Sequence, residues 1–365
     1  HPTLPVVVDM SIVKDSKRQG RNYAPEYNIH DSGVFTAFAK YEIEIECLNS
    51  LVGIGTPYQT ADLLNAHVFK PVIKYILSGL QETNYPISYS EQDIIFQDYG
   101  KLIWGKDYEE RKNIDFIGPS SHTLELRNIM PVNPDAMVPN IRQNYTVTDK
   151  ADGDRKLLFI APNGKIYLIS TNMEIQFTGT ISKNKDLWNT LLDGEHIIYD
   201  KKKKFINMYA AFDIYYVGGE DIRSKGFMPI NDEEIRTNFR LLILNDVVDK
   251  LYAVSIVNES SPVPLKITKK RFYLGTETQS IFQGCSYILK KEQDGLFEYE
   301  TDGLIFTPAN MGVGAKIGEK IKPTKMSWEY SFKWKPVEFN TIDFLVSLKK
   351  NENGSDMIGS TFNTG

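Results

Sequence analysis

From Tyr145 onward the sequence is a succession of short segments rich in β-branched and aromatic residues, separated by turns such as Pro162-Asn163-Gly164 and Val217-Gly218-Gly219. This pattern is typical of short strands joined by tight turns. An amphipathic helix is predicted earlier, because apolar residues from Leu64 to Leu77 recur mostly three and four positions apart after Thr60. Helical and strand segments are therefore combined in one chain, and we predict an α+β fold.

The beginning of the chain predicts two further strands, Leu4 to Lys14 and Phe35 to Cys47. Alternation within the second strand puts Glu42, Glu44 and Glu46 on one face. Like charges so close together are unfavourable unless a metal ion or basic groups lie opposite them. A solvent-facing edge strand is the alternative interpretation.

Charge and cysteine content limit the classes of protein. Lys and Arg number 42 against 47 Asp and Glu, a net charge of −5, which argues against a general nucleic-acid coat but allows a local basic groove. We interpret the run Lys201 to Lys204 as a solvated hairpin turn rather than a dedicated RNA contact. A helix is predicted around Ile230 to Leu251. The cysteines, Cys47 and Cys285, are too few for a disulfide framework, so we expect a reducing compartment.

The ends of the sequence and its hydropathy bear on location. No stretch approaches the roughly 18 apolar residues of a membrane span, and the first residues lack the features of a signal peptide. We expect a soluble intracellular protein with no membrane partner. The chain begins at His1 and ends in a polar stretch, so we expect a fragment of a longer polypeptide.

The most informative segment is Thr148 to Arg155, TDKADGDR, followed by the apolar strand Leu157 to Ile160. Lys150 would lie between a strand and a glycine turn, with Asp152 and Arg155 close behind it. Such a lysine suits covalent nucleotide chemistry, because nearby cations or a metal lower the pKa of an amine and so supply a nucleophile. A surface turn with a salt-bridged lysine is the alternative.

Four later segments follow in a fixed order: Leu192-Asp193-Gly194-Glu195, Ala211 to Tyr215, Thr301 to Phe306, and Ser331 to Pro336. Together with Lys150 to Arg155, they resemble the KxDGxR, DGE, aromatic-Asp, DGLIF and KWK motifs of the covalent lysyl-nucleotidyltransferases. That superfamily comprises the mRNA capping guanylyltransferases and the nucleic-acid ligases. The resemblance runs from about Phe116 to Val346 and implies an antiparallel-sheet, ATP-grasp-like nucleotidyltransferase domain.

The resemblance implies a role for each matching residue. Lys150 would be the catalytic nucleophile that attacks the α-phosphorus of a nucleoside triphosphate. Nucleotide-binding roles fall to Arg155, Glu195, Phe212, Asp302, Lys333 and Lys335: the lysines would meet the α-phosphate, Arg155 and Glu195 the ribose, and Phe212 the base. Glu195 and Asp302 would also hold Mg²⁺ or Mn²⁺. We expect Asp193 and Asp213 to fix strand and turn geometry.

The acidic strand has a resemblance of its own. Val8 to Lys14 and Lys40 to Glu46 are similar to the last strands of tunnel-type, metal-dependent RNA triphosphatases, in which Glu42, Glu44 and Glu46 would bind metal. A triphosphatase segment before a nucleotidyltransferase is the order found in the capping enzymes of large cytoplasmic DNA viruses. The implied partners are GTP, the 5′ end of RNA and a cap methyltransferase domain or subunit, and the implied location is the cytoplasm, including a viral factory or virion.

We therefore predict four parts: a β-tunnel remnant at 1–52, a helical connector at 53–112, a guanylyltransferase domain at 113–337, and the start of an OB-fold at 338–365. The residues after Pro336 are too few for a complete OB-fold. An ATP-dependent polynucleotide ligase and a catalytically silent scaffold that binds RNA or a methyltransferase are the alternatives. The sequence leaves the choice between GTP and ATP open.

Overall fold

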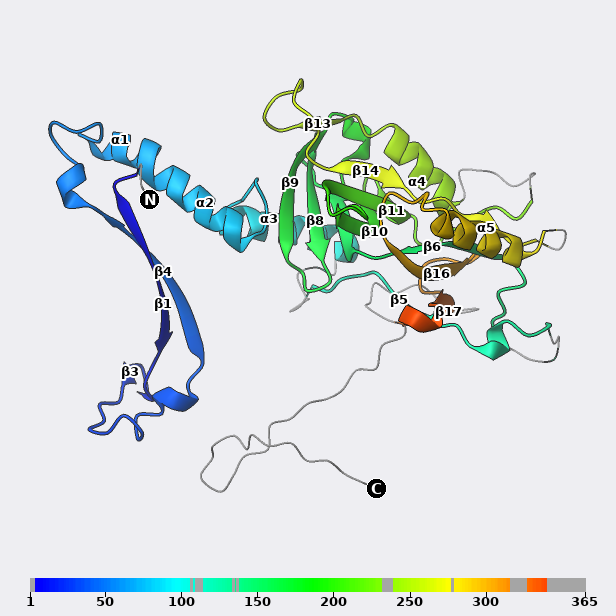
Figure 1. Ribbon diagram of the computed structural model, residues 1–365, viewed down its shortest axis with the longest axis horizontal. Helices are drawn as coiled ribbons and strands as arrows, with labels where there is room; N and C mark the ends of the chain where they lie inside the picture. Colours follow the sequence, from blue (N-terminus) through cyan, green and yellow to red (C-terminus); the bar gives the residue numbers. More distant parts are fainter. Residues whose placement is uncertain are drawn as a thin grey trace. The chain divides into compact units, whose positions relative to one another are not determined.

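The computed structural model describes residues 4–105, 108, 114–132, 135, 138–231, 239–276, 279–315 and 327–339. The chain divides into two units, residues 1–87 and 88–365, which are coloured blue to cyan and cyan to red in Figure 1. The division falls within the segment 53–112 that we predicted as a helical connector. Each unit is described by itself.

The first unit contains a long two-stranded ribbon. Strand β1 (Val6–Lys14) pairs antiparallel with β4 (Ala39–Cys47), which confirms both predicted strands, although the second begins later because Val34–Thr36 forms a 3₁₀ turn. The short strands β2 (Arg18–Gln19) and β3 (Asn22–Tyr23) form a second pair within the connection. Cross-strand register places Glu42, Glu44 and Glu46 on one face, opposite Ser11, Asp9 and Val7 respectively. The predicted acidic face therefore exists, and Asp9 adds to it.

The predicted amphipathic helix is present as α1 (Ala61–Leu64), a π-helical turn (Asn65–Phe69) and α2 (Lys70–Leu80). Thr60 caps it, since its side chain accepts a hydrogen bond of 3.3 Å from the Leu63 amide. The wider turn before α2 accommodates Pro71, which has no N–H to donate to the turn before it. Val68 and Val72 bury their side chains against Val6.

The second unit is built from two sheets. The larger sheet has the strand order β12-β11-β10-β7-β8-β9-β13, with β14 paired to β11, and the smaller has the order β15-β6-β16-β17-β5. Their bounds are β5 Ser120–Thr123, β6 Tyr145–Ala151, β7 Asp154–Ile160, β8 Lys165–Ser170, β9 Ile175–Ser182, β10 Thr190–Tyr199, β11 Phe205–Val217, β12 Glu220–Asp221, β13 Ala253–Ser255, β14 Lys266–Lys269, β15 Tyr273–Leu274, β16 Thr301–Pro308 and β17 Ser327–Trp334.

Helices cover the sheets. Helix α4 (Arg240–Asp249) packs on the larger sheet and α5 (Ile281–Gln293) on the smaller, as Figure 1 shows, while α3 (Tyr89–Trp104) opens the unit. The helix predicted around 230–251 is thus α4, but residues 232–238 lie outside the described part of the chain. We did not predict α5. Short 3₁₀ turns occur at Asn49–Leu51, Leu126–Asn128, Lys185–Leu187 and Val337–Phe339.

The predicted combination of helices with antiparallel sheets is confirmed. Parallel pairing is confined, among the described strands, to β5 with β17 and β11 with β14. The segment predicted as the start of an OB-fold lies outside the described residues from 340 onward. Within the described ranges, none of the helices combines the length and apolar composition that crossing a bilayer requires.

Candidate active site

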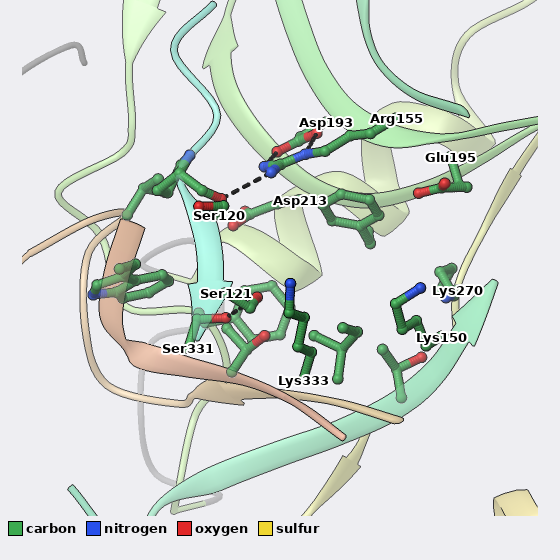
Figure 2. A pocket seen from close by; sticks show the side chains of 18 of the residues that line it. Ser120, Ser121, Lys150, Arg155, Asp193, Glu195, Asp213, Lys270, Ser331 and Lys333 are labelled. Carbon is green, nitrogen blue, oxygen red and sulfur yellow. Dashed lines mark hydrogen bonds and ion pairs between the residues drawn. The ribbon is translucent and has the colours of Figure 1, made fainter. Parts of the chain in front are cut away.

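A cavity of about 290 Å³ lies between the two sheets of the second unit. The smaller sheet contributes Lys150, Ile305 and Lys333, and the larger sheet contributes Arg155, Glu195 and Phe212, which lie on β7, β10 and β11. Figure 2 shows labelled side chains from both walls around the cavity, with Lys150 and Glu195 at one end and Ser121 and Ser331 at the other. Segments that are far apart in sequence thus meet in one site.

Lys150 is held by an acid that it shares with a second lysine. Its Nζ lies 2.7 Å from Oδ1 of Asp302, and Nζ of Lys335 lies 2.7 Å from Oδ2 of the same carboxylate. Burial alone would raise the pKa of Asp302, but the hydrogen bonds from the two lysines outweigh burial and lower it. The carboxylate is therefore ionised at neutral pH, and it keeps the nucleophile candidate and Lys335 side by side.

Lys333 is differently placed. Lys333 lies within strand β17 and lines the cavity. Strand β17 ends at Trp334, so Lys335 lies just beyond the end of the strand. Trp334 packs against the core of the smaller sheet. Among the described residues no carboxylate pairs with Lys333, and Figure 2 shows its side chain rising into the middle of the cavity. It is a cation available to an anionic ligand.

Arg155 is fixed by a buried acid. Its Nε and Nη2 donate to Asp193 at 3.1 and 2.5 Å, and Nη1 donates to the carbonyl oxygen of Pro119 at 2.8 Å. Tyr215 also donates to Asp193, which is fully buried. Burial works against the charged guanidinium, but the charge of Asp193 outweighs it, and the pKa of Arg155 is raised. The guanidinium lies 5.6 Å from the ring centre of Phe212, so these two predicted nucleotide contacts are adjacent.

Glu195 lies close to a second buried lysine that we did not predict. The side chain of Lys270 is 4% exposed and its Nζ lies 2.9 Å from Oδ2 of Asp149, which also accepts a 3.0 Å hydrogen bond from Tyr299. Burial raises the pKa of Glu195 to about 7, although Lys270, Lys150 and Arg155 oppose the rise. At neutral pH Glu195 is thus divided between its acid and carboxylate forms, which suits a group that binds a hydroxyl or a cation.

His196 follows Glu195 on β10 but is not part of the cavity lining. Burial, followed by the charge of Lys156, lowers the pKa of His196 to about 4. Its Nδ1 lies 3.1 Å from Nζ of Lys156 and its Nε2 lies 2.8 Å from Oδ1 of Asn207. Because Lys156 can only donate, the neutral ring accepts at Nδ1 and donates from Nε2 to the amide oxygen. His196 is therefore a buried strand residue that takes no part in the cavity.

The far end of the cavity is lined by residues that sequence reasoning missed. The Ser121 and Ser331 hydroxyls are 2.7 Å apart, and Ser120 and Ser327 are 3.1 Å apart, because β5 pairs parallel with β17. Asp213 also faces the cavity and is held by Arg240, a fully buried residue on α4. The serines carried no sequence signal, since only strand pairing brings them together.

The charged groups permit a test of the metal prediction. Within the described residues, no three or more His, Cys, Asp and Glu side chains are grouped so as to hold a metal ion. Glu195 makes no ion pair there, and Asp302 is occupied by two lysines. A hard cation takes phosphate oxygens as readily as carboxylates, so a metal ion held by Glu195 and Asp302 would need further ligands beyond these two acids. The same finding covers Glu42, Glu44 and Glu46 in the first unit, which share a face of β4 but do not form such a group.

The fold and the cavity define a class: a two-sheet domain with a lysine-centred, cation-rich cavity suited to a nucleotide. Comparison with known proteins gives the family, since residues 138–336 match the model of the mRNA capping enzyme catalytic domain. The chain belongs to the mRNA capping enzyme family. The resemblance seen in the motifs is thereby confirmed.

Individual relatives are similar over different extents. A probable mRNA-capping enzyme of Acanthamoeba polyphaga mimivirus is 27% identical over 89% of this chain and 27% of its own length. An mRNA-capping enzyme of Danio rerio is 27% identical over 67% of this chain and 36% of its own length. An mRNA-capping enzyme of African swine fever virus (isolate Pig/Kenya/KEN-50/1950) is 28% identical over 55% of this chain and 18% of its own length. The chain thus spans well under half the length of these relatives.

Solved structures are less similar. A mycobacterial DNA ligase D complexed with ATP and MES has a TM-score of 0.32 and 13% identity, covering 52% of this chain and 54% of that chain. A Lig E DNA ligase has a TM-score of 0.34 and 13% identity, covering 67% of this chain and 83% of the ligase chain.

Proposed function

We propose that this chain is an mRNA guanylyltransferase that transfers GMP from GTP to the 5′-diphosphate end of RNA through a covalent intermediate on Lys150. The observation that carries the proposal is the position of Lys150. Its amine lies in the cavity between the sheets, beside Asp302 and Lys335, with Lys333 close by. The names of the relatives support the same reaction.

The proposed reaction has two displacements at one phosphorus. Lys150 gives up a proton, its Nζ bonds to the α-phosphorus of GTP, and the bond to the bridging oxygen breaks to release pyrophosphate. A terminal oxygen of the RNA 5′-diphosphate then bonds to the same phosphorus, and the phosphorus–nitrogen bond breaks. The products are GpppRNA and free Lys150, which recovers its proton.

The surrounding residues fit these steps. Lys333 and Lys335 would neutralise charge on the α-phosphate as the new bond forms, and Asp302 would hold the Lys150 side chain toward it. Arg155 and Glu195 would bind the ribose hydroxyls. Phe212 would stack on the base, with Ile305 lining the opposite wall.

A bound Mg²⁺ or Mn²⁺ would neutralise phosphate charge. Glu195, which lines the cavity, and Asp302, which is paired with Lys150, are the side chains that would hold it. In the first unit, we propose that Glu42, Glu44 and Glu46 belong to an RNA triphosphatase tunnel of the longer protein. The support is their shared face on the β1 and β4 ribbon. Residues 338–365 would open an OB-fold, a cap methyltransferase domain or subunit would be a partner, and the cytoplasm would be the location.

The experiment is incubation of the purified chain with α-labelled GTP or ATP and Mg²⁺, followed by denaturing electrophoresis. We expect label from GTP alone on the wild type and none on Lys150→Ala. Label from ATP alone would instead support the ligase alternative. No label from either nucleotide, including in a longer chain that carries the OB-fold, would support the silent scaffold.

A further inference from the structure

The turn between β10 and β11 has an unusual surface. Lys201, Lys202, Lys203 and Lys204 follow one another there, and none of their ammonium groups has an ion pair among the described residues. Tyr199 and Phe205 flank the run, are directly paired across the hairpin, and are 54% and 59% exposed. We call residues 199–205 the basic hairpin tip.

The tip has a defined backbone. Oδ1 of Asp200 accepts hydrogen bonds of 2.8 Å from the amides of both Lys202 and Lys204, and the Lys203 amide donates to the Asp200 carbonyl at 2.9 Å. Lys203 has a left-handed φ of 61°, which closes the turn. The prediction of a hairpin turn is therefore confirmed, and its like charges are held close together.

Acids near the tip neutralise only part of its charge, since the carboxylate of Asp200 offsets one of the four lysines. Asp200 is engaged by the turn amides, and Glu298, whose carbonyl accepts a hydrogen bond from the Lys201 amide, has its carboxylate 2.6 Å from Nζ of Lys266. Lysines without partners repel one another in the free protein. Binding of a nucleic acid to them is favourable, because its phosphates release their counterions when the lysines take their place.

The tip is also connected to the candidate active site. Two residues before Tyr199, Ile197 packs against Ala151, the neighbour of Lys150. A methyl group at Gly153 would lie 2.8 Å from the His196 carbonyl oxygen and 3.1 Å from Ile197, so the turn after Lys150 lies directly on β10. Two strand residues span about 7 Å. Tyr199, where the tip begins, is therefore about 7 Å along β10 from Ile197, which contacts the turn after Lys150.

The sequence alone favoured a solvated turn over an RNA contact, but the exposed aromatic pair and the position beside the nucleophile turn favour the contact. We propose that the basic hairpin tip binds the first single-stranded nucleotides of the RNA whose 5′-diphosphate accepts the guanylyl group, an assignment that rests on the proposed function. The lysines contact phosphates. Tyr199 and Phe205 pack edge to face with their ring centres 6.1 Å apart and remain more than half exposed, so the ring surfaces turned away from this contact stack on bases. Stacking with cations alongside binds single strands without a sequence requirement, which suits an enzyme that acts on many transcripts. An acidic protein segment would use the lysines but would not need the aromatic pair.

The test compares three variants in the full chain. Lys202→Gln/Lys203→Gln/Lys204→Gln removes three charges from the tip, and Lys183→Gln/Lys185→Gln/Lys250→Gln removes the same charge near the other end of β10. Phe205→Leu removes one aromatic ring. Binding of a 3′-fluorescein-labelled, 5′-diphosphate single-stranded RNA is followed by anisotropy over a series of KCl concentrations, and lysyl-GMP formation is measured without RNA.

We expect the tip triple variant to bind RNA between roughly 10-fold and 50-fold more weakly near 0.15 M salt, with the slope of log affinity against log salt smaller by about 2. Phe205→Leu should weaken binding about tenfold. Lysyl-GMP formation should be unchanged. RNA binding within twofold of the wild type, or an equal loss in the control triple variant, would overturn the assignment. An unchanged Phe205→Leu would favour the acidic protein segment and equally overturn it. If neither the wild type nor any variant formed lysyl-GMP, the guanylyltransferase proposal would be refuted. The anisotropy measurements would still show whether the basic hairpin tip binds RNA.

Discussion

Gly303, between Asp302 and Leu304 on β16, offers a sharp test of how the two strands position the lysines. Its φ is 140°, a value that a residue with a Cβ rarely adopts, and an added Cβ would lie 2.0 Å from the carbonyl oxygen of Trp334. An ordinary contact begins at 3.4 Å, so the chain around Trp334 must move by about 1.4 Å, the difference between the two distances. Lys333 and Lys335 flank Trp334 and must move with it.

Gly303→Ala should therefore impair stability and chemistry together. Backbone strain and overpacking each cost about 1 to 3 kcal/mol, so we expect the free energy of unfolding to fall by about 2 to 6 kcal/mol. A displacement above 1 Å at a reacting group costs about 100-fold in rate, so lysyl-GMP formation should fall at least that far at temperatures where the variant is folded. The assays are urea unfolding and a labelled-GTP time course.

Gly295→Ala is the matched control. Gly295 also has a positive φ, 68°, but an added Cβ there has nothing within 4 Å. It should lose about 1 kcal/mol through backbone strain and keep its rate of lysyl-GMP formation. If Gly303→Ala behaved like Gly295→Ala, the close approach of β16 and β17 would not be what positions the lysines, and our reasoning would be refuted.

Three further changes test other contacts. Burial raises the pKa of Glu195 from 4.5 to about 7, so between these pH values the native state binds a proton that the unfolded state lacks. The stability of the wild type should therefore fall by about 3 kcal/mol relative to that of Glu195→Gln as the pH rises from 4.5 to 7. Thermal-stability profiles of the two proteins that ran parallel over this pH range would contradict the prediction. Asp193→Ala leaves Arg155 and Tyr215 without their buried acceptor and should cost about 3 to 5 kcal/mol in urea unfolding, and a loss below 1 kcal/mol would show that the pair contributes little. Thr60→Ala removes a helix cap and should lower the stability of the first unit by about 1 kcal/mol, seen as faster amide exchange near Leu63; unchanged exchange would argue against the cap.

Much of the fold could be predicted because the periodicities are local. The alternation around Glu42 to Glu46 places their side chains on one face whatever the strand pairs with, and the spacing from Leu64 to Leu77 predicts a helix face. Helix α5 could have been predicted and was overlooked: Ile281, Cys285 and Ile288 recur four and three positions apart and Ser280 caps the start, and the smaller sheet buries the face that they form.

Some residues of the candidate site could be predicted from local motifs, and others could not. Lys150, Glu195 and Asp302 were found because each lies in a short motif. Lys150 and Glu195 line the cavity, and Asp302 joins them through its ion pair with Lys150. Lys270 was missed because its place depends on the parallel pairing of β14 with β11, which brings a lysine from an ordinary basic stretch to Asp149. Nothing local distinguishes such a lysine from a solvated one, so only the tertiary arrangement identifies it.

The pairing of the cations suggests how nucleotide binding and chemistry are linked. Asp302 holds both Lys150 and Lys335, and Asp149 holds Lys270, whereas Lys333 has no such partner in the described part of the chain. In the proposed reaction, an entering triphosphate would meet Lys333 without displacing an acid, but it would engage Lys335 only by competing with Asp302. Each phosphate contact that draws Lys335 away leaves Asp302 free to bind Lys150 more strongly or to accept its proton. The acid that keeps the lysines together at rest is thus the group best placed to register that a nucleotide has arrived.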